Sequence, residues 1–228
     1  MTKLAFSLAL LAGLTAHQAQ SPDPASFPPS TVPLAQGLGY VDPLTLHAPR
    51  NFLNDFPTRQ GELVTAVIEI PAGYCEKWEV KADGLMRWDI KDGKPRQVKY
   101  LGYPCNYGML PRTRLGKELG GDGDPLDVLV LGPALPRGTV VAVRVLGTIR
   151  LVDAGERDDK LVAVVPGSPL DQAKSVSELE STYPGITTIL RAWFENYKGK
   201  GALQCSGFGE PAVAEELVRA AESSFERR

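Results

Sequence analysis

The sequence predicts one α+β domain, in which a closed or nearly closed β-sheet is covered by helices. Short strand-like runs, bounded by clusters of Gly, Pro and Asp, occupy the first two thirds of the chain. Two segments of helical periodicity follow, and strands followed by helices are typical of the α+β class. The predicted strands span residues 63–70, 97–101, 126–131, 140–151 and 161–165.

The two predicted helices differ in the signal that marks them. In the first, at about 186–197, apolar side chains recur at i, i+4, i+7, i+8 and i+11 and form a stripe that faces the core. The second starts at Pro211, because proline is favoured in the first turn of a helix, and continues to about residue 225. The stripe of the first helix consists of Ile186, Leu190, Trp193, Phe194 and Tyr197.

The charge and the cysteine content exclude several classes of protein. The formal net charge is −2, so the chain lacks the basic character of proteins that bind nucleic acid or an anionic membrane. Three cysteines are too few for a disulfide framework. Two histidines and no C-x-x-C motif make a zinc site unexpected.

The N-terminal residues 1–19 predict a secretory signal. Lys3 supplies the positive charge, and residues 4–14 form an apolar run that is too short to cross a bilayer. Cleavage after Ala16 or after Ala19 would leave a mature chain of net charge about −3; a buried N-terminal helix is the alternative. A Pro-rich tether is expected at 20–43 and the folded domain at 44–228, in a soluble protein exported to the periplasm or the extracellular space.

The acidic segment 122–127, DGDPLD, stands at the start of the predicted strand 126–131. Asp122, Asp124 and Asp127 repel one another unless cations compensate them, and Mg²⁺ and Ca²⁺ bind oxygen ligands. A solvated acidic turn is the plain alternative. An EF-hand is excluded, because its twelfth position requires Glu and the chain has Pro133 there.

Five segments of the chain form a recognisable series: 67–71 with 77–79, 103–108 (YPCNYG), 122–127, 153–160 (DAGERDDK) and 193–198 (WFENYK). Together they resemble the soluble inorganic pyrophosphatases of the first family, which are Mg²⁺-dependent barrel enzymes. The resemblance implies a five-stranded OB-like β-barrel with two or three helices packed outside. It implies hydrolysis of pyrophosphate to two phosphates by a water activated between bridged Mg²⁺ ions.

The resemblance also implies a role for each matching residue. Three to four Mg²⁺ ions would bind per site, with Mn²⁺ or Co²⁺ as substitutes, and the protein would be a homo-oligomer. Asp124 would be the general base and Tyr103 a phenol beside the leaving group. The metal ligands would be Asp122, Asp127, Asp158, Asp153 and Glu69, and the phosphate contacts Lys77, Arg96, Tyr107, Lys160, Tyr197 and Lys198.

One departure from the family pattern is Ala154, which replaces a second acid of the 153–160 loop and would weaken the third metal site. The phosphate arginine is assigned to Arg96 rather than to Arg87, because the segment 93–96 (GKPR) leads directly into the strand before Tyr103.

Two further readings of the whole chain remain open at this point. One is an inactive exported module that sequesters divalent cations or polyphosphate. The other is an OB-type binder of single strands, which the acidic cluster disfavours because such proteins have a basic groove.

Overall fold

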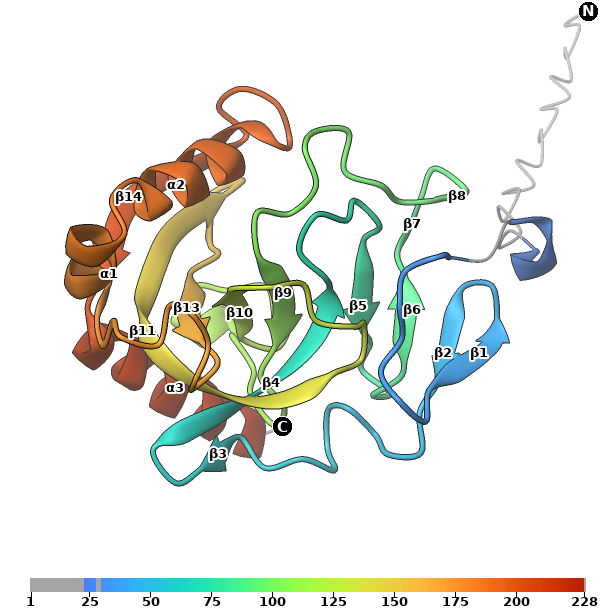
Figure 1. Cartoon of the computed structure of the whole chain (residues 1–228). Coiled ribbons are helices and arrows are strands. Elements are labelled where there is room, and N and C mark those ends of the chain that lie inside the picture. The colour runs from blue at the N-terminus through green and yellow to red at the C-terminus, as the bar shows by residue number, and fades with distance from the viewer. Residues whose placement is uncertain (1–22, 28–29, 228) are drawn as a thin grey trace, which may run out of the picture.

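The computed structural model describes residues 23–27 and 30–227. Five strands pair successively and close into a ring (Figure 1). All neighbouring pairs in the ring are antiparallel except β10 and β13, which are parallel. The α+β class is therefore confirmed. In ring order the strands are β4 (Leu63–Ile70), β9 (Asn106–Met109), β10 (Asp127–Leu131), β13 (Lys160–Val164) and β11 (Val140–Asp153).

The ring is closed by close backbone packing and by one long strand. At Gly108 in β9, an added Cβ would lie 2.0 Å from the carbonyl oxygen of Val67, so only glycine fits between β9 and β4. β11 is long enough to pair with β4 at its start and with β13 and β14 (Leu203–Gly209) further along. A bulge near Gly147 bends β11 between these partners.

The shorter elements surround the ring. A second sheet in the order β1-β2-β6-β5 lies at the N-terminal side (Figure 1), where β1 is Gly39–Asp42, β2 Thr45–His47, β6 Met86–Trp88 and β5 Trp78–Val80. β3 (Arg59–Gln60) pairs with β4, β12 (Glu156–Arg157) with β11, and β7 (Ile90–Lys91) with β8 (Lys94–Pro95). Two 3₁₀ turns span Pro24–Ser26 and Lys117–Leu119.

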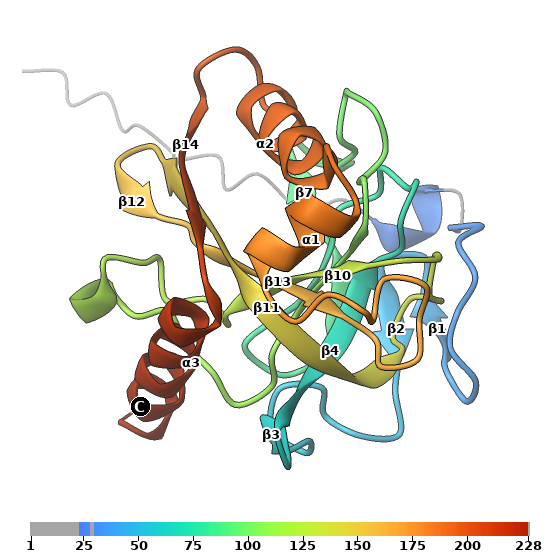
Figure 2. The same ribbon diagram turned by 60° about the vertical axis from the view of Figure 1, so that its left-hand side comes forward.

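Three α-helices occur in the described part of the chain, and they cover two sides of the ring (Figure 2). α1 (Val176–Thr182) and α2 (Ile186–Asn196) bury Leu179, Leu190 and Phe194 against one apolar cluster. α3 (Pro211–Glu226) buries Leu217 and Val218 against another. Each of the two predicted helices matches its observed helix to within a residue, and α1 was not predicted. None of the described helices has both the length and the apolar character needed to cross a membrane.

The predicted strand at 97–101 is wrong. Apart from an isolated bridge at Gln97, this segment is irregular, and Leu101 is 72% exposed. The strand lies further on, in β9, whose residues Asn106–Met109 are all buried. A polar and glycine-containing strand gives no apolar run, so its signal was weaker than that of 97–101.

The predicted leader, 1–19, lies outside the described residues, but much of the predicted tether is described. Residues from 30 onward lie on the folded domain: Val32 is buried, and the carbonyl of Pro33 accepts a hydrogen bond from the backbone N–H of Arg137 at 2.8 Å. The side chain of Arg137 donates to Ser30 Oγ and is itself fully buried. This segment is held by the domain rather than extended away from it.

Candidate active site

A cavity of about 470 Å³ opens beside the strand ring, and the predicted site residues meet there. Tyr103 is the one exception, since it lies behind the wall of the cavity. Residues distant in the sequence reach this place because β4, β5, β9, β10 and β13 bring their ends to one side of the fold. The predicted residues that line the cavity are Glu69, Lys77, Arg96, Tyr107, Asp122, Asp124, Asp127, Asp153, Asp158, Lys160, Tyr197 and Lys198.

A buried lysine joins two of the carboxylates. Asp127 starts β10 and Lys160 starts β13, and these strands are parallel neighbours, so the two side chains are delivered to the same edge. Lys160 Nζ donates to Asp127 Oδ2 at 2.7 Å and to Asp158 Oδ1 at 2.8 Å. Burial would lower the pKa of Lys160, but Asp127 and Asp158 outweigh it and raise this pKa. The lysine is therefore charged and serves as a counter-ion within the site.

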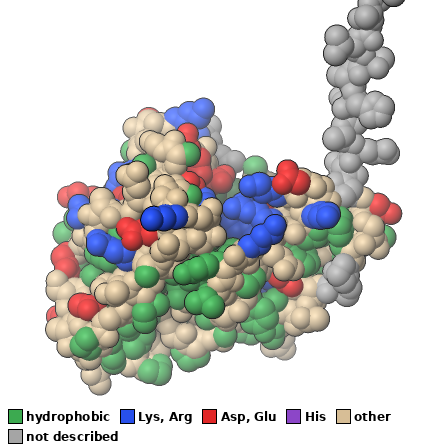
Figure 3. Space-filling view, turned by 90° about the horizontal axis from the view of Figure 1, so that it is seen from above, with side chains coloured by type: hydrophobic (Ala, Val, Ile, Leu, Met, Phe, Trp, Pro, Cys, Tyr) green, Lys and Arg blue, Asp and Glu red, His purple; other side chains and the backbone are tan. Residues whose placement is uncertain are grey.

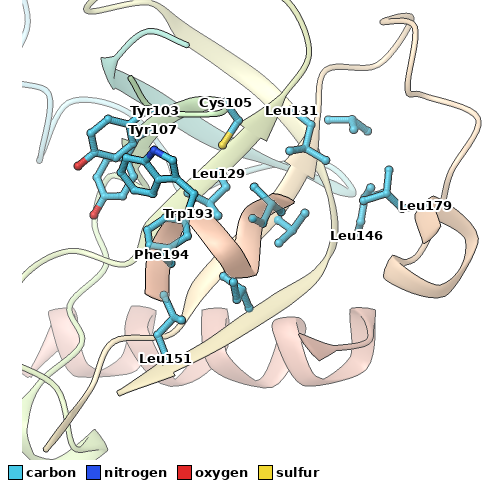
Figure 4. Close-up of a cluster of buried hydrophobic side chains, with 14 of the residues drawn as sticks. Tyr103, Cys105, Tyr107, Leu129, Leu131, Leu146, Leu151, Leu179, Trp193 and Phe194 are labelled. Atoms are coloured by element: carbon cyan, nitrogen blue, oxygen red, sulfur yellow. The ribbon is translucent and has the colours of Figure 1, made fainter. Parts of the chain in front are cut away.

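Aromatic residues form the floor beneath this ion pair. The phenol of Tyr107 donates to Asp127 Oδ2, and burial together with Asp127 raises the pKa of Tyr107 well above its usual value, so the phenol keeps its proton. Tyr103 packs against Tyr107, with ring centroids 5.1 Å apart, and against Trp193 of α2 at 4.5 Å. Trp193 stacks on Tyr197, with ring centroids 4.4 Å apart. Figure 4 shows that the phenols of Tyr103 and Tyr107 point in the same direction.

The acidic loop brings the carboxylates of Asp122, Asp124 and Asp127 together, and Lys160 pairs with Asp127. Asp122 accepts a hydrogen bond from the backbone N–H of Asp124 at 2.9 Å, which turns the loop back on itself. Burial, followed by the charges of Asp122, Glu79 and Asp127, raises the pKa of Asp124 to about 6. Opposing carboxylates thus destabilise one another here, which is the electrostatic condition for a cation site.

Glu69 is the most deeply buried carboxyl of the cavity. It is 3% exposed, and its Oε1 accepts a hydrogen bond from the backbone N–H of Val80 at 2.6 Å. Burial, with Asp127 as the next cause, raises its pKa well above the usual value. A buried acid in an apolar strand needs a polar partner, and the backbone of β5 supplies one.

A basic wall faces the carboxylates. Lys77 and Arg96 line it, whereas Arg87 pairs with Asp83 and does not line the cavity. Burial would lower the pKa of Lys77, but Tyr103, followed by Glu79 and Asp127, outweighs it and raises this pKa well above its usual value. On the face shown in Figure 3, Lys and Arg side chains gather near the middle. The location favours Arg96 over Arg87 as the phosphate arginine.

Two lining residues of this wall were missed at the sequence level. Lys77 directly precedes β5, Glu79 lies within it and Lys81 directly follows it. Because these residues are two positions apart along an extended chain, their side chains lie on the same side, where all three line the cavity. Lys77 Nζ lies 3.1 Å from Glu79 Oε1. The charge alternation at a period of two was the available signal, but it is also typical of an exposed strand.

The 153–160 loop takes part in a second ion pair between a lysine and a carboxylate. Lys198, just after α2, donates to Asp153 Oδ2 at the end of β11. Ala154 follows in the turn to β12 with a φ of 50°, a left-handed conformation that is uncommon outside glycine. Ala154 adds no carboxylate to the site.

The donor set fits a hard cation rather than a soft one. Among the described residues, no three His, Cys, Asp or Glu side chains are gathered as a ready metal-binding group. Lysines form ion pairs with Asp127, Asp158 and Asp153. The carboxylate oxygens around the cavity match the ligands that Mg²⁺ binds. The residues present therefore fit Mg²⁺.

Comparison with known proteins gives one consistent result. The family model for inorganic pyrophosphatase matches residues 66–226. Inorganic pyrophosphatase 1 of Caenorhabditis elegans is 34% identical over 174 residues, which are 68% of this chain and 41% of that protein. The mitochondrial inorganic pyrophosphatase of Saccharomyces cerevisiae is 34% identical over 171 residues, 65% of this chain and 55% of that one. The chain thus spans about half the length of these curated relatives.

Solved structures resemble the fold as well. The type I inorganic pyrophosphatase from Toxoplasma gondii superimposes with a TM-score of 0.71 at 32% identity, over 78% of this chain and 88% of that one. Inorganic pyrophosphatase from Thermus thermophilus gives 0.65 at 31% identity, over 78% of this chain and 99% of that one. With the family model covering most of the domain, the chain belongs to the family I soluble inorganic pyrophosphatases.

Proposed function

We propose that the protein hydrolyses pyrophosphate to two phosphates in a Mg²⁺-dependent reaction. The observation that carries this proposal is that one cavity is lined both by many carboxylates and by cationic side chains, Lys77 and Arg96 among them. Pyrophosphate is highly charged near neutral pH, so carboxylates alone would repel it. Cations bound between the carboxylates and the substrate remove that conflict, while Lys77 and Arg96 neutralise the far side.

The carboxylates are assigned to metal binding as the family pattern suggests. Asp122, Asp127 and Asp158 would hold one ion, and Asp127 would also reach a second. Asp153 with Asp158 would hold a third, and Glu69 a fourth, in line with three to four Mg²⁺ per site and Mn²⁺ or Co²⁺ as substitutes. When bound, such ions acidify water and neutralise phosphate oxygens.

The remaining residues bind the substrate and move the proton. Asp124 accepts the proton of the attacking water, and its position at the loop between Asp122 and Asp127 supports that role. The phosphate contacts are assigned to the cavity-lining Lys77, Arg96, Tyr107, Lys160, Tyr197 and Lys198. Tyr103 is 1% exposed and backs Tyr107, so we assign its phenol to the leaving-group side of the floor.

Substitution of two neighbouring aspartates tests this division of labour. Asp127→Asn should abolish turnover, since a ligand shared by two ions is lost and each ~1.4 kcal/mol of transition-state stabilisation is about tenfold in rate. Asp124→Asn should lower kcat by roughly 10²–10⁴-fold, the usual contribution of a general base, while Mg²⁺ affinity measured by calorimetry changes little. If Asp124→Asn loses Mg²⁺ and excess Mg²⁺ restores its activity, Asp124 is a ligand instead. Metal binding without any turnover in the native protein would favour the sequestering module.

The proposal also covers the type of barrel, the oligomeric state and the export of the protein. The ring of five strands would form an OB-like barrel, which its closed pairing supports. The protein would act as a homo-oligomer, and light scattering and sedimentation would test this oligomeric state. Nucleic acid and membranes are not expected as partners. Export with removal of residues 1–19 rests on Lys3 and the apolar run 4–14. Cell fractionation and N-terminal sequencing test this prediction. Recovery of the protein from the cytoplasm with Met1 still attached would contradict export.

A further inference from the structure

Lys81 lies in the basic wall of the cavity without a role in the proposed reaction. Its side chain is 37% exposed, whereas that of Lys77 is 11% exposed, so Lys81 is at the outer part of this wall. It follows β5 directly, and its ammonium group reaches both Glu79 and, 3.6 Å away, Asp89 Oδ1.

Both partners of Lys81 are shared with phosphate-binding cations. Glu79 places Oε1 3.1 Å from Lys77 Nζ and Oε2 against Lys81. Asp89 places Oδ1 near Lys81 and Oδ2 3.1 Å from Arg96 Nη1. The five side chains form one continuous chain of alternating charge, in which Lys81 is the central link and each carboxylate divides its two oxygens between two cations.

The division of the oxygens has a consequence for the substrate. Without Lys81, the free oxygen of Asp89 could turn to the Arg96 guanidinium, and a bidentate carboxylate–arginine pair is stronger than a single contact. Glu79 would likewise hold Lys77 more closely. The net charge of these five ion-paired side chains, three cations and two anions, would also fall from +1 to zero.

We infer that Lys81 is a positioning residue that keeps Lys77 and Arg96 available to pyrophosphate by holding the second oxygens of Glu79 and Asp89. The inference rests on the proposed function, because it concerns affinity for that substrate. Lys81 acts through the other two cations and contacts neither phosphate nor metal.

The primary test is steady-state hydrolysis of pyrophosphate at saturating Mg²⁺ by Lys81→Met, with the inhibition constant of methylenediphosphonate as a readout independent of turnover. We expect KM and the inhibition constant to rise about fivefold, the effect of one partly exposed ion pair, with kcat changed less than about twofold. Lys81→Arg should restore both values. Lys91→Met removes an exposed lysine of neighbouring β7 outside the cavity and should leave both unchanged.

A double-mutant cycle with Asp89→Asn separates the mechanisms. In the Lys81→Met background, Asp89→Asn should lower KM by about fivefold, because it releases Arg96, whereas in the native background it should change KM less than about twofold. Equal factors in both backgrounds would mean that Lys81 contacts phosphate directly and would overturn the inference. A lowered melting temperature with unchanged KM would overturn it as well. Absence of hydrolysis by the native protein would instead refute the proposed function.

Discussion

Replacing Lys160 by Met removes the buried counter-ion of the site while retaining most of its apolar stem. The Lys160 side chain is 3% exposed, and those of Asp127 and Asp158 are 24% and 25% exposed. Breaking a buried ion pair costs roughly 3–5 kcal/mol because the remaining charge is left unpaired. Water reaches about a quarter of each carboxylate, so we expect the lower end, about 3 kcal/mol of unfolding free energy in EDTA.

Magnesium should reduce that loss. If Mg²⁺ binds at Asp127 and Asp158, it supplies the positive charge that Lys160 supplied, so the difference in unfolding free energy between variant and native protein should narrow at saturating Mg²⁺. By linkage, calorimetry should then show tighter Mg²⁺ binding to the variant.

Urea unfolding with and without Mg²⁺ measures the difference. Lys174→Met, which removes an exposed lysine paired with Asp171, should cost about 1 kcal/mol or less in either condition. A Lys160→Met loss below about 1 kcal/mol in EDTA would refute the assignment of a buried counter-ion. An equal loss with and without Mg²⁺ would place the ion elsewhere.

Three further predictions concern other parts of the fold. Lys77 and Lys81 lower the pKa of Glu79 from 4.5 to about 2 against the effect of burial, so its carboxylate stabilises the fold above pH 4.5 and loses this effect as the pH falls toward 2. In EDTA over that range, the native protein should therefore lose about 3 kcal/mol more unfolding free energy than Glu79→Gln, and equal losses would contradict the shift. Gly108→Ala should destabilise by about 2 kcal/mol or more, because its Cβ would meet a backbone oxygen at 2.0 Å, and an unchanged melting temperature would show that β9 moves freely. Removing residues 1–38 should cost about 1–3 kcal/mol more unfolding free energy than removing 1–29, because Arg137 then also loses the hydrogen-bond partners that 30–38 provide. Equal losses for the two truncations would refute the packing of that segment.

The acidic loop was predictable from sequence because its chemistry is local. Asp122, Asp124 and Asp127 lie within six residues, and their mutual repulsion is evident without a structure. The apolar strands and the stripe of α2 were also predictable, since periodicity and propensity agree there.

Other features depend on contacts between distant segments. β9 was missed because its polar and glycine residues are buried by β4 and β10, and burial of that kind leaves no apolar run. Lys81 follows β5 and Asp89 follows β6, so their pairing depends on how these two strands fold together, and the sequence shows only separate surface charges. Arg96 was already preferred to Arg87 from the sequence, but that Arg96 lines the cavity and Arg87 does not is visible only in the structure.

Release of phosphate from pyrophosphate by the native protein, with Mg²⁺ and with excess EDTA, tests the central claim most directly. Asp127→Asn serves as the matched control, because it preserves the size of the side chain and removes its charge. The account predicts phosphate release that requires Mg²⁺ and that Asp127→Asn abolishes. Absence of release at saturating Mg²⁺, or release that neither EDTA nor Asp127→Asn diminishes, would contradict it.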